Sequence, residues 1–301
     1  MSFSSQVKNE ISGSLLNEIE NRYLLLGYIY INAIYNGDKT ALSLENMSIA
    51  KKIFKTLKYS FKLNVNMTVR LQKKFIVKRL FIFEIPASKD IFMSELKTID
   101  TSDREELISF VKGVFLASGS INDPKKSQYH LEMLFQKEEK AKVLQGLLVS
   151  LGYDFHIIKR GKGYMLYLKA SEEISDFLKL LGAINSLFYF EDIRIYRDHK
   201  NMVNRLNNCE QANLEKSLKT SDKQLETINY LKNNDYYSLL DEKTVQVCEY
   251  RLRYPEMSFQ ALADIISHEI DRKVTKSYIN HHFRKINEVY ERIINIDSKN
   301  T

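Results

Sequence analysis

The sequence predicts an α+β protein in which a duplicated α-β-β-α-β-β-α unit precedes an all-helical C-terminal part. Two apolar, glycine-centred helical segments recur along the chain, and the same order of elements follows each of them. Helical periodicity from Asp222 onward supports the all-helical part. We expect a first repeat over 1–103, a second over 104–200, a linker over 201–221 and a helical domain over 222–301.

The elements of the first repeat follow from its apolar runs and turn residues. An apolar helix over 25–33 leads into a turn at 36–38, where Gly37 lies between two short polar residues. A strand over 40–44, a helix over 45–59 and two strands over 61–71 and 75–85 should follow, the last two separated by Gln72, Lys73 and Lys74.

The second repeat has the same order. Its apolar helix over 104–117 is followed by a turn over 118–126, a strand over 128–135 and a helix over 137–151. A hairpin should span 153–169, because the glycines on either side of Lys162 suit its tip at 160–163, and a helix over 172–181 closes the unit.

The two glycine-centred segments, Leu25–Ala33 and Val111–Gly119, are apolar on nearly every face, which indicates helices buried on several sides. They resemble the paired helices of LAGLIDADG homing endonucleases, and the alternative is two ordinary core helices. In active members of that family the eighth position carries an acid that holds a divalent metal. The matching residues here, Asn32 and Ser118, are neutral. The resemblance therefore implies a DNA-binding scaffold without catalytic residues or a metal.

Basic residues accompany the predicted strands. The LAGLIDADG resemblance implies two four-stranded sheets that form a saddle over DNA, so these residues are candidate phosphate contacts. Lysines on strands can equally be solvated residues that protect sheet edges. The net charge of +7 is concentrated at the N-terminal side, with +5 over 1–103, +3 over 104–221 and −1 over 222–301. The candidates are Arg70, Lys73, Lys74, Lys78, Arg79, Arg160 and Lys162.

Composition narrows the location and the class of protein. The polar residues Met1–Ser5 are not followed by the apolar segment of a secretion signal. The longest apolar run is shorter than the roughly 20 residues that cross a bilayer. Cys209 and Cys248 form neither a disulfide framework nor a metal-binding spacing. We expect a cytoplasmic, nucleoid-associated protein that needs no cofactor.

The C-terminal domain should contain helices over 222–233, 241–253, 258–266 and 275–294. The last of them has an apolar stripe, and its other faces carry donors suited to base edges in the major groove of DNA. An ordinary amphipathic surface helix is the alternative. The adjacent histidines at 281 and 282 point in different directions on a helix, so no metal site is expected. The candidate DNA-binding residues are Lys276, Ser277, Asn280, His281, Arg284 and Lys285.

The whole chain resembles the bacterial WhiA family, which joins a degenerate LAGLIDADG domain to a helix-turn-helix domain. That resemblance implies a sequence-specific DNA-binding regulator of transcription, connected with cell division, and not an enzyme. The first repeat and the final connector depart most from the family pattern. The segments that carry the resemblance are 1–8, 113–121, 129–132, 167–169, 181–183, 204–213 and 275–286.

Two other functions compete with the regulator. An adaptor would use the degenerate domain to hold a partner protein, and nothing in the residues conflicts with that use. A metal-dependent DNA endonuclease would need carboxylates to fix the metal ions that activate water. Asn32 and Ser118 cannot supply that charge, and Asp38 and Asp123, a few residues beyond them, suit turns better.

Overall fold

A computed structural model describes residues 1–73, 77–87, 89–97, 103–126 and 128–297. The chain divides into two compact units, Met1–Asp198 and His199–Thr301, and each is described by itself. Lys74 of the predicted basic set lies outside the described residues, and so do the side chains of Lys73 and Lys78.

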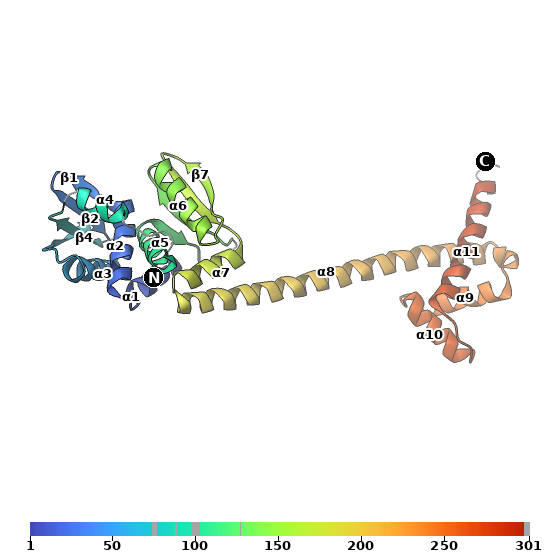
Figure 1. Ribbon diagram of the computed structural model, residues 1–301. Helices are drawn as coiled ribbons and strands as arrows, with labels where there is room; N and C mark the ends of the chain where they lie inside the picture. The colour runs from blue at the N-terminus through green and yellow to red at the C-terminus, as the bar shows by residue number, and fades with distance from the viewer. Residues whose placement is uncertain (74–76, 88, 98–102, 127, 298–301) are drawn as a thin grey trace. The chain divides into compact units, whose positions relative to one another are not determined.

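The first unit contains both copies of the predicted repeat, in the predicted order (Figure 1). The first copy consists of α2 (Glu18–Asn32), β1 (Ile34–Asn36), β2 (Lys39–Leu44), α3 (Met47–Tyr59), β3 (Asn66–Lys73), β4 (Val77–Ile85) and α4 (Lys89–Lys97). The second consists of α5 (Arg104–Ser118), β5 (Gly119–Ile121), β6 (Leu131–Phe135), α6 (Glu138–Ser150), β7 (His156–Arg160), β8 (Gly163–Leu168) and α7 (Ser171–Leu180).

Each repeat forms its own antiparallel sheet of four strands. The strand order is β1-β2-β4-β3 in the first and β5-β6-β8-β7 in the second, so the two copies share one topology. The hairpin tip at Gly161 and Lys162 is confirmed, because Arg160 pairs with Gly163 across it and Gly161 has a φ of +60°. Only glycine adopts this left-handed conformation without steric cost.

The centre of the first unit is the contact between α2 and α5, which lie side by side in Figure 1. A Cβ atom on Gly27 would lie 2.1 Å from the carbonyl oxygen of Phe110, and one on Gly113 would lie 1.9 Å from that of Leu24. Only glycine therefore permits the two backbones to approach this closely. The buried residues of both repeats join in one hydrophobic core around this contact.

An additional helix that the sequence analysis did not predict precedes the first repeat. In α1 (Phe3–Gly13), Phe3, Val7 and Ile11 are buried, and Ser2 caps the helix by accepting from the backbone N–H of Ser5. Glu10 of this helix accepts hydrogen bonds from the backbone N–H groups of residues 185 and 186. The helix therefore joins the start of the chain to the end of the repeated unit.

Two boundaries inside the repeats differ from the prediction. Residues 72 and 73 continue β3, where the sequence analysis expected a break, because they pair with Lys78 and Val77 of β4 in an unbroken antiparallel register. The predicted turn over 118–126 contains the short strand β5, which pairs with β6. Partners in the sheet, which are distant in sequence, decided both differences.

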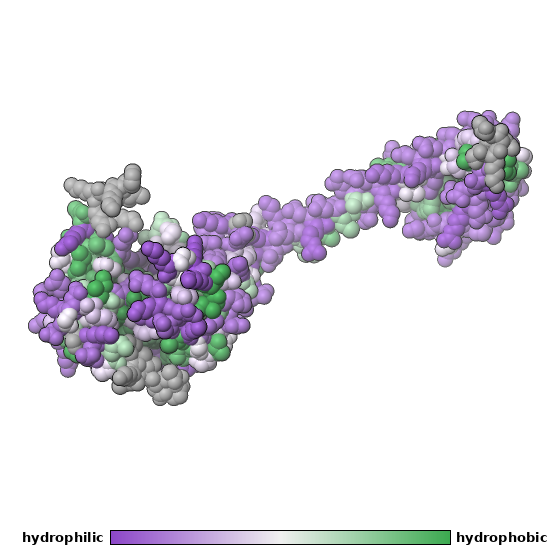
Figure 2. Space-filling view, turned by 90° about the horizontal axis from the view of Figure 1, so that it is seen from above, coloured by the Kyte–Doolittle hydropathy of each residue, from purple (hydrophilic) through white to green (hydrophobic). Residues whose placement is uncertain are grey.

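The predicted linker over 201–221 is helical. A single helix, α8 (Ile184–Asn233), runs through it and includes the predicted helix over 222–233. The asparagines of this stretch disfavour a helix by only a fraction of a kcal/mol each. Local pairs compensate, since Arg194 bonds to Glu191 and Gln211 bonds to Glu215 within the helix. In Figure 2 the surface of this stretch is mostly hydrophilic, with scattered apolar side chains.

The second unit is all-helical. After the end of α8 it contains η1 (Tyr236–Leu239), α9 (Glu242–Arg253), α10 (Phe259–Glu269) and α11 (Lys276–Asp297). The connector between α10 and α11 is shorter than predicted, because α10 continues to Glu269. A separate core holds these helices together, built from α8 residues such as Ile228 and α11 residues such as Ile279 and Ile286.

Within the described part of the chain, no helix is long and apolar enough to span a bilayer. Both cysteines are free thiols, Cys209 exposed and Cys248 buried, and burial raises the pKa of the Cys248 thiol to about 12.

Candidate nucleic-acid interface

The pair α10 and α11 is positioned by side-chain caps at its helix starts. Ser258 caps α10 by accepting from the backbone N–H of Ala261 at 3.2 Å, and Thr275 accepts from the N–H of Tyr278 at 3.3 Å at the start of α11. These bonds satisfy N–H groups that have no partner within their helices. Each helix therefore begins at a defined residue.

The connector between α10 and α11 is fixed by Ser267. Its hydroxyl oxygen accepts from the N–H of Val274 at 2.8 Å and lies 2.7 Å from the carbonyl oxygen of Ala263. Val274 is buried, and Asp271 takes a left-handed conformation with a φ of +46°. The turn between the two helices is therefore held at both ends by local contacts.

A buried arginine joins α9, α10 and α11. Arg251 of α9 is only 2% exposed, and its Nη1 donates to the carbonyl oxygens of Tyr254, Pro255 and Met257, the last at 2.6 Å. Its guanidinium carbon also lies 5.3 Å from the ring centre of Phe259 and 5.7 Å from that of Phe283. The sequence analysis did not single out Arg251, because its role depends on partners that only the fold brings together.

Four of the six predicted reading residues are exposed on α11: Lys276, Ser277, His281 and Arg284. Asn280 and Lys285 are half-buried. The apolar stripe of the same helix is buried as predicted, and Phe283 stacks on Phe259 of α10 with ring centres 5.1 Å apart. The polar face over the first turns of α11 therefore remains open to solvent.

Lys285 differs from the other candidates because it already has a partner. Its Nζ lies 2.9 Å from Oδ2 of Asp241, the residue that caps α9. Beyond it, Glu288 and Glu291 are exposed on α11 and carry the opposite charge. The donors free for a ligand are thus concentrated at the start of the helix.

The two adjacent histidines of α11 have different environments. His281 is exposed, whereas His282 is 4% exposed and its Nδ1 lies 2.7 Å from the hydroxyl of Thr244. Thr244 in turn donates to Oδ1 of Asp241. Burial lowers the pKa of His282, and the hydrogen bonds from Lys285 and Thr244 lower the pKa of Asp241.

Two basic residues next to the predicted set were missed by the sequence analysis. Arg272 and Lys273 are exposed in the connector that leads into α11. The two adjacent basic residues shortly before Lys276 could have been recognised in the sequence. The sequence did not show, however, in which direction the side chains of the connector point. Together with the start of α11 they form a basic surface of the second unit.

The predicted basic residues of the first unit differ in their exposure and in their partners. Arg70 on β3, Arg79 on β4 and Lys162 at the hairpin tip are exposed. Arg160 is paired with Glu132, with 2.9 Å between Nη1 and Oε2, so part of its charge is compensated. Arg70, Arg79 and Lys162 are thus exposed members of the predicted set, and the register of β3 with β4 places Arg70 and Arg79 on opposite faces of their sheet.

The two degenerate positions lie at equivalent places, since Asn32 is the last residue of α2 and Ser118 the last of α5. The Asn32 Nδ2 lies 3.4 Å from the carbonyl oxygen of Ala117, and the Ser118 hydroxyl donates to that of Val114 at 3.1 Å. Across the described residues, no group of three or more His, Cys, Asp or Glu side chains could hold a metal ion. Asp38 and Asp123 lie in turns.

Comparisons with known proteins match this architecture along its length. Three family profiles align in order: the WhiA N-terminal LAGLIDADG-like domain over 30–99, the WhiA LAGLIDADG-like domain over 107–200 and the WhiA C-terminal HTH domain over 203–290. The chain is 33% identical over 309 residues to the probable cell division protein WhiA of Enterococcus faecalis, covering 97% of this chain and 98% of that one. The chain belongs to the WhiA family.

Two further relatives agree with this assignment. The probable cell division protein WhiA of Bacillus subtilis is 33% identical over 310 residues, with 97% of each chain covered. The crystal structure of full-length WhiA from Thermotoga maritima covers 97% of this chain and 99% of its own, with a TM-score of 0.61 and 25% identity. The duplicated LAGLIDADG-like domain and the helix-turn-helix domain predicted from the sequence are confirmed.

Proposed function

We propose that this WhiA family member is a sequence-specific DNA-binding regulator of transcription, connected with cell division. The observation that carries the proposal is the start of α11, where Lys276, Ser277, His281 and Arg284 are exposed on a helix that caps and core contacts hold in place. The N-terminal residues of a recognition helix contact base edges in helix-turn-helix proteins. Arginine and lysine pair with guanine there, and Asn280 suits adenine.

The test replaces one reading residue and one matched arginine of the same helix. Arg284→Ala should weaken binding to the chain's own operator by about 1–3 kcal/mol and relax base preference at one position. Arg292→Ala is the control, because Arg292 is also exposed on α11 but lies about two turns farther along. Operators would first be mapped by chromosomal occupancy, and affinities then measured by fluorescence anisotropy. Equal affinities of parent and Arg284→Ala would show that α11 does not read DNA.

Salt dependence separates base reading from phosphate binding. Arg70, Arg79 and Lys162 of the first unit could neutralise DNA phosphates. In that case their combined replacement by alanine should make the negative slope of log affinity against log salt concentration less steep. The expected decrease is about 0.9 for each phosphate that the variant no longer neutralises. The base preference of the operator should be unchanged, because phosphate contacts carry no sequence information. An unchanged slope would remove the first unit from the DNA interface.

We also propose that the chain does not cleave DNA. Asn32 and Ser118 stand where the LAGLIDADG resemblance implies acids, and both use their polar atoms within the paired helices. Water activation by a bound metal requires ligands that hold the ion. Incubating the full chain with Mg²⁺ and a plasmid that carries its operator should leave the plasmid supercoiled, and the appearance of linear product would contradict the proposal.

A second candidate function, an adaptor that binds a partner protein, rests on the outer strand β3. Met67, Val69 and Leu71 alternate along it and are 45%, 48% and 58% exposed. Apolar side chains on an outer strand favour pairing with another chain. Replacement of Val69 by lysine should abolish cross-linking of such a partner in cells while leaving operator binding intact, whereas an unchanged cross-linking pattern would argue against the adaptor.

A further inference from the structure

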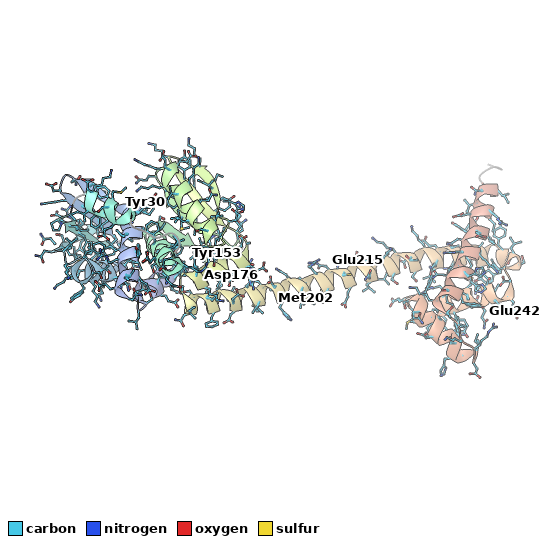
Figure 3. All side chains as sticks on the ribbon, viewed as in Figure 1. Tyr30, Tyr153, Asp176, Met202, Glu215 and Glu242 are labelled. Atoms are coloured by element: carbon cyan, nitrogen blue, oxygen red, sulfur yellow. The ribbon has the colours of Figure 1, made fainter. Side chains whose placement is uncertain are left out.

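A pocket of about 610 Å³ opens where α2 and α5 end, between the two repeats of the first unit. Asn32 and Ser118 both lie in its wall, with residues from the strand ends and from the start of α6. Tyr30, labelled in Figure 3, belongs to the same wall toward the end of α2. The volume falls within the range of roughly 300–1,000 Å³ that is usual for pockets that bind small molecules.

Three lysines line the pocket: Lys89 of α4, Lys137 before α6 and Lys140 within α6. The described residues of its wall include no aspartate or glutamate. The positive charges of the lysines therefore favour an anion as the ligand.

Lys140 is the most constrained of the three. Its Nζ donates to the backbone carbonyl of Tyr30 and lies 4.8 Å from the centre of that ring. An ammonium group has three donors, so this contact leaves two for a ligand. Burial lowers the pKa of Lys140, and the charges of Lys137 and Lys89 lower it further.

Aromatic and aliphatic side chains also line the pocket. Tyr30, Tyr35, Ile31, Met93 and Phe135 contribute to it, and the two tyrosines are half-buried. Burial and the charge of Glu139 raise the pKa of Tyr30, so its phenol stays neutral and can donate a hydrogen bond. A wall of this kind accepts a planar organic group rather than a second charge.

We propose that this pocket binds a small phosphate-bearing molecule with a planar group, of which a nucleotide is the simplest example. The three lysines hold the phosphates, and the tyrosines contact the planar group. Asn32, Ser118 and Gln136 also line the pocket. The proposal goes beyond DNA reading by α11, which belongs to the other unit. A phosphate of the DNA backbone, which brings no planar group into the pocket, fits the aromatic wall less well.

The experiment uses the full chain and defined probes. Isothermal titration with the four common ribonucleoside diphosphates should detect binding of at least one, and pyrophosphate should compete for it whereas the bare nucleoside should compete poorly. The double variant Lys137→Gln, Lys140→Gln should bind it roughly tenfold or more weakly, because each lysine makes a charge-assisted contact. Lys55→Gln is the matched control, since Lys55 is exposed on α3 and outside the pocket.

Measurements of operator binding distinguish a free small molecule from the DNA backbone as the source of the phosphate. Operator affinity of the double variant should equal that of the parent if the ligand is a free small molecule. Weakened operator binding, with no nucleotide bound by the parent, would overturn the proposal and assign the lysines to the DNA backbone. The absence of any nucleotide binding would overturn it as well.

A second measurement does not depend on the folding of the variants. Photo-labelling of the parent chain with an azido analogue of the nucleotide that binds should place the label on peptides that contain Tyr30 or Tyr35. Excess unmodified nucleotide should suppress that label. Labelling elsewhere on the chain would overturn the assignment to this pocket.

Discussion

At the residue scale, the absence of a Cβ atom at Gly27 and Gly113 allows α2 and α5 to pack closely. Each faces a backbone carbonyl of the opposite helix at a distance that no side-chain atom tolerates. The cost of a Cβ here cannot be relieved by moving a flexible side chain, because the atoms it would meet are backbone. The two helices would have to separate, and they are the centre of the core that both repeats share.

Gly113→Ala should therefore destabilise the first unit by about 1–3 kcal/mol, the usual cost of an overpacked core. Alanine's better helix propensity, worth about 1 kcal/mol, only reduces that effect. Gly146→Ala is the matched control, because Gly146 is exposed on α6 with nothing within 4 Å of an added Cβ. Chemical denaturation should show the control to be slightly more stable than the parent. A stable Gly113→Ala variant would contradict the close helix contact.

His282 predicts how the stability of the second unit depends on pH. Its pKa in the folded chain is lowered by burial from an ordinary value of about 6.5. Protonation therefore favours the unfolded chain, so this stabilisation is present above about pH 6.5 and is lost as the pH falls below that value. Asp241, whose pKa is also lowered, loses its contribution only below its ordinary value of 3.8.

The midpoint of thermal unfolding should thus decrease in the parent chain as the pH is lowered from about 7 to about 5.5. His282→Gln, which cannot titrate there, should have a lower midpoint at neutral pH because its contact with Thr244 is altered, but a flatter pH dependence. Differential scanning fluorimetry at several pH values provides the measurement. Equal slopes for the two proteins would show that His282 does not titrate in this range.

At the scale of elements, α9, α10 and α11 depend on the buried Arg251. Replacement by methionine would retain much of the volume but remove the donor of the Met257 carbonyl, whereas the carbonyls of Tyr254 and Pro255 keep the Met257 N–H and the Ser221 hydroxyl. An unsatisfied buried polar group costs about 1–3 kcal/mol, so Arg251→Met should destabilise the second unit by at least that amount and weaken operator binding.

Arg253→Met provides the comparison on the same helix. Arg253 is 64% exposed in its side chain and pairs with Glu269 at 3.5 Å, an interaction of a kind that contributes about 1 kcal/mol or less. Urea denaturation of both variants should separate them clearly. If both were destabilised equally, the role assigned to Arg251 would be wrong.

The elements also show where local reasoning succeeded and where it failed. The order of strands and helices in both repeats was predictable, because apolar periodicity and turn residues are local properties. The long helix that contains the linker was not predicted. Its start is fixed by the contact from Glu10 to residues 185 and 186, which crosses most of the first unit's sequence.

Among the described residues, each of the two units has its own hydrophobic core, and these cores share no residue. A stability change in one core should therefore leave the other's unfolding transition in place. Scanning calorimetry should resolve two transitions, of which Gly113→Ala shifts only one and Arg251→Met only the other. A single transition that both variants shift equally would mean that the units unfold together.

Some residues of the candidate sites could be predicted from the sequence, whereas others could be identified only from the structure. Lys276 and Arg284 could be chosen from helical spacing alone, because a helix with one apolar stripe must expose its remaining faces. The pairing of Lys285 with Asp241 and the burial of His282 required contacts across 44 and 38 residues of sequence, which no local pattern contains. The lysines of the pocket come from α4 and from the start of α6, and no spacing links them.

The sequence by itself determined the duplication, the neutral residues at the two helix ends and the exposed polar face of the last helix. Each of these follows from residue type and short-range periodicity, which a linear chain displays directly. Only the tertiary structure decided which charges are compensated, which arginine is buried and where a pocket forms. These depend on side chains that approach from distant segments, and electrostatic and packing energies are set by distance in space rather than by separation along the chain.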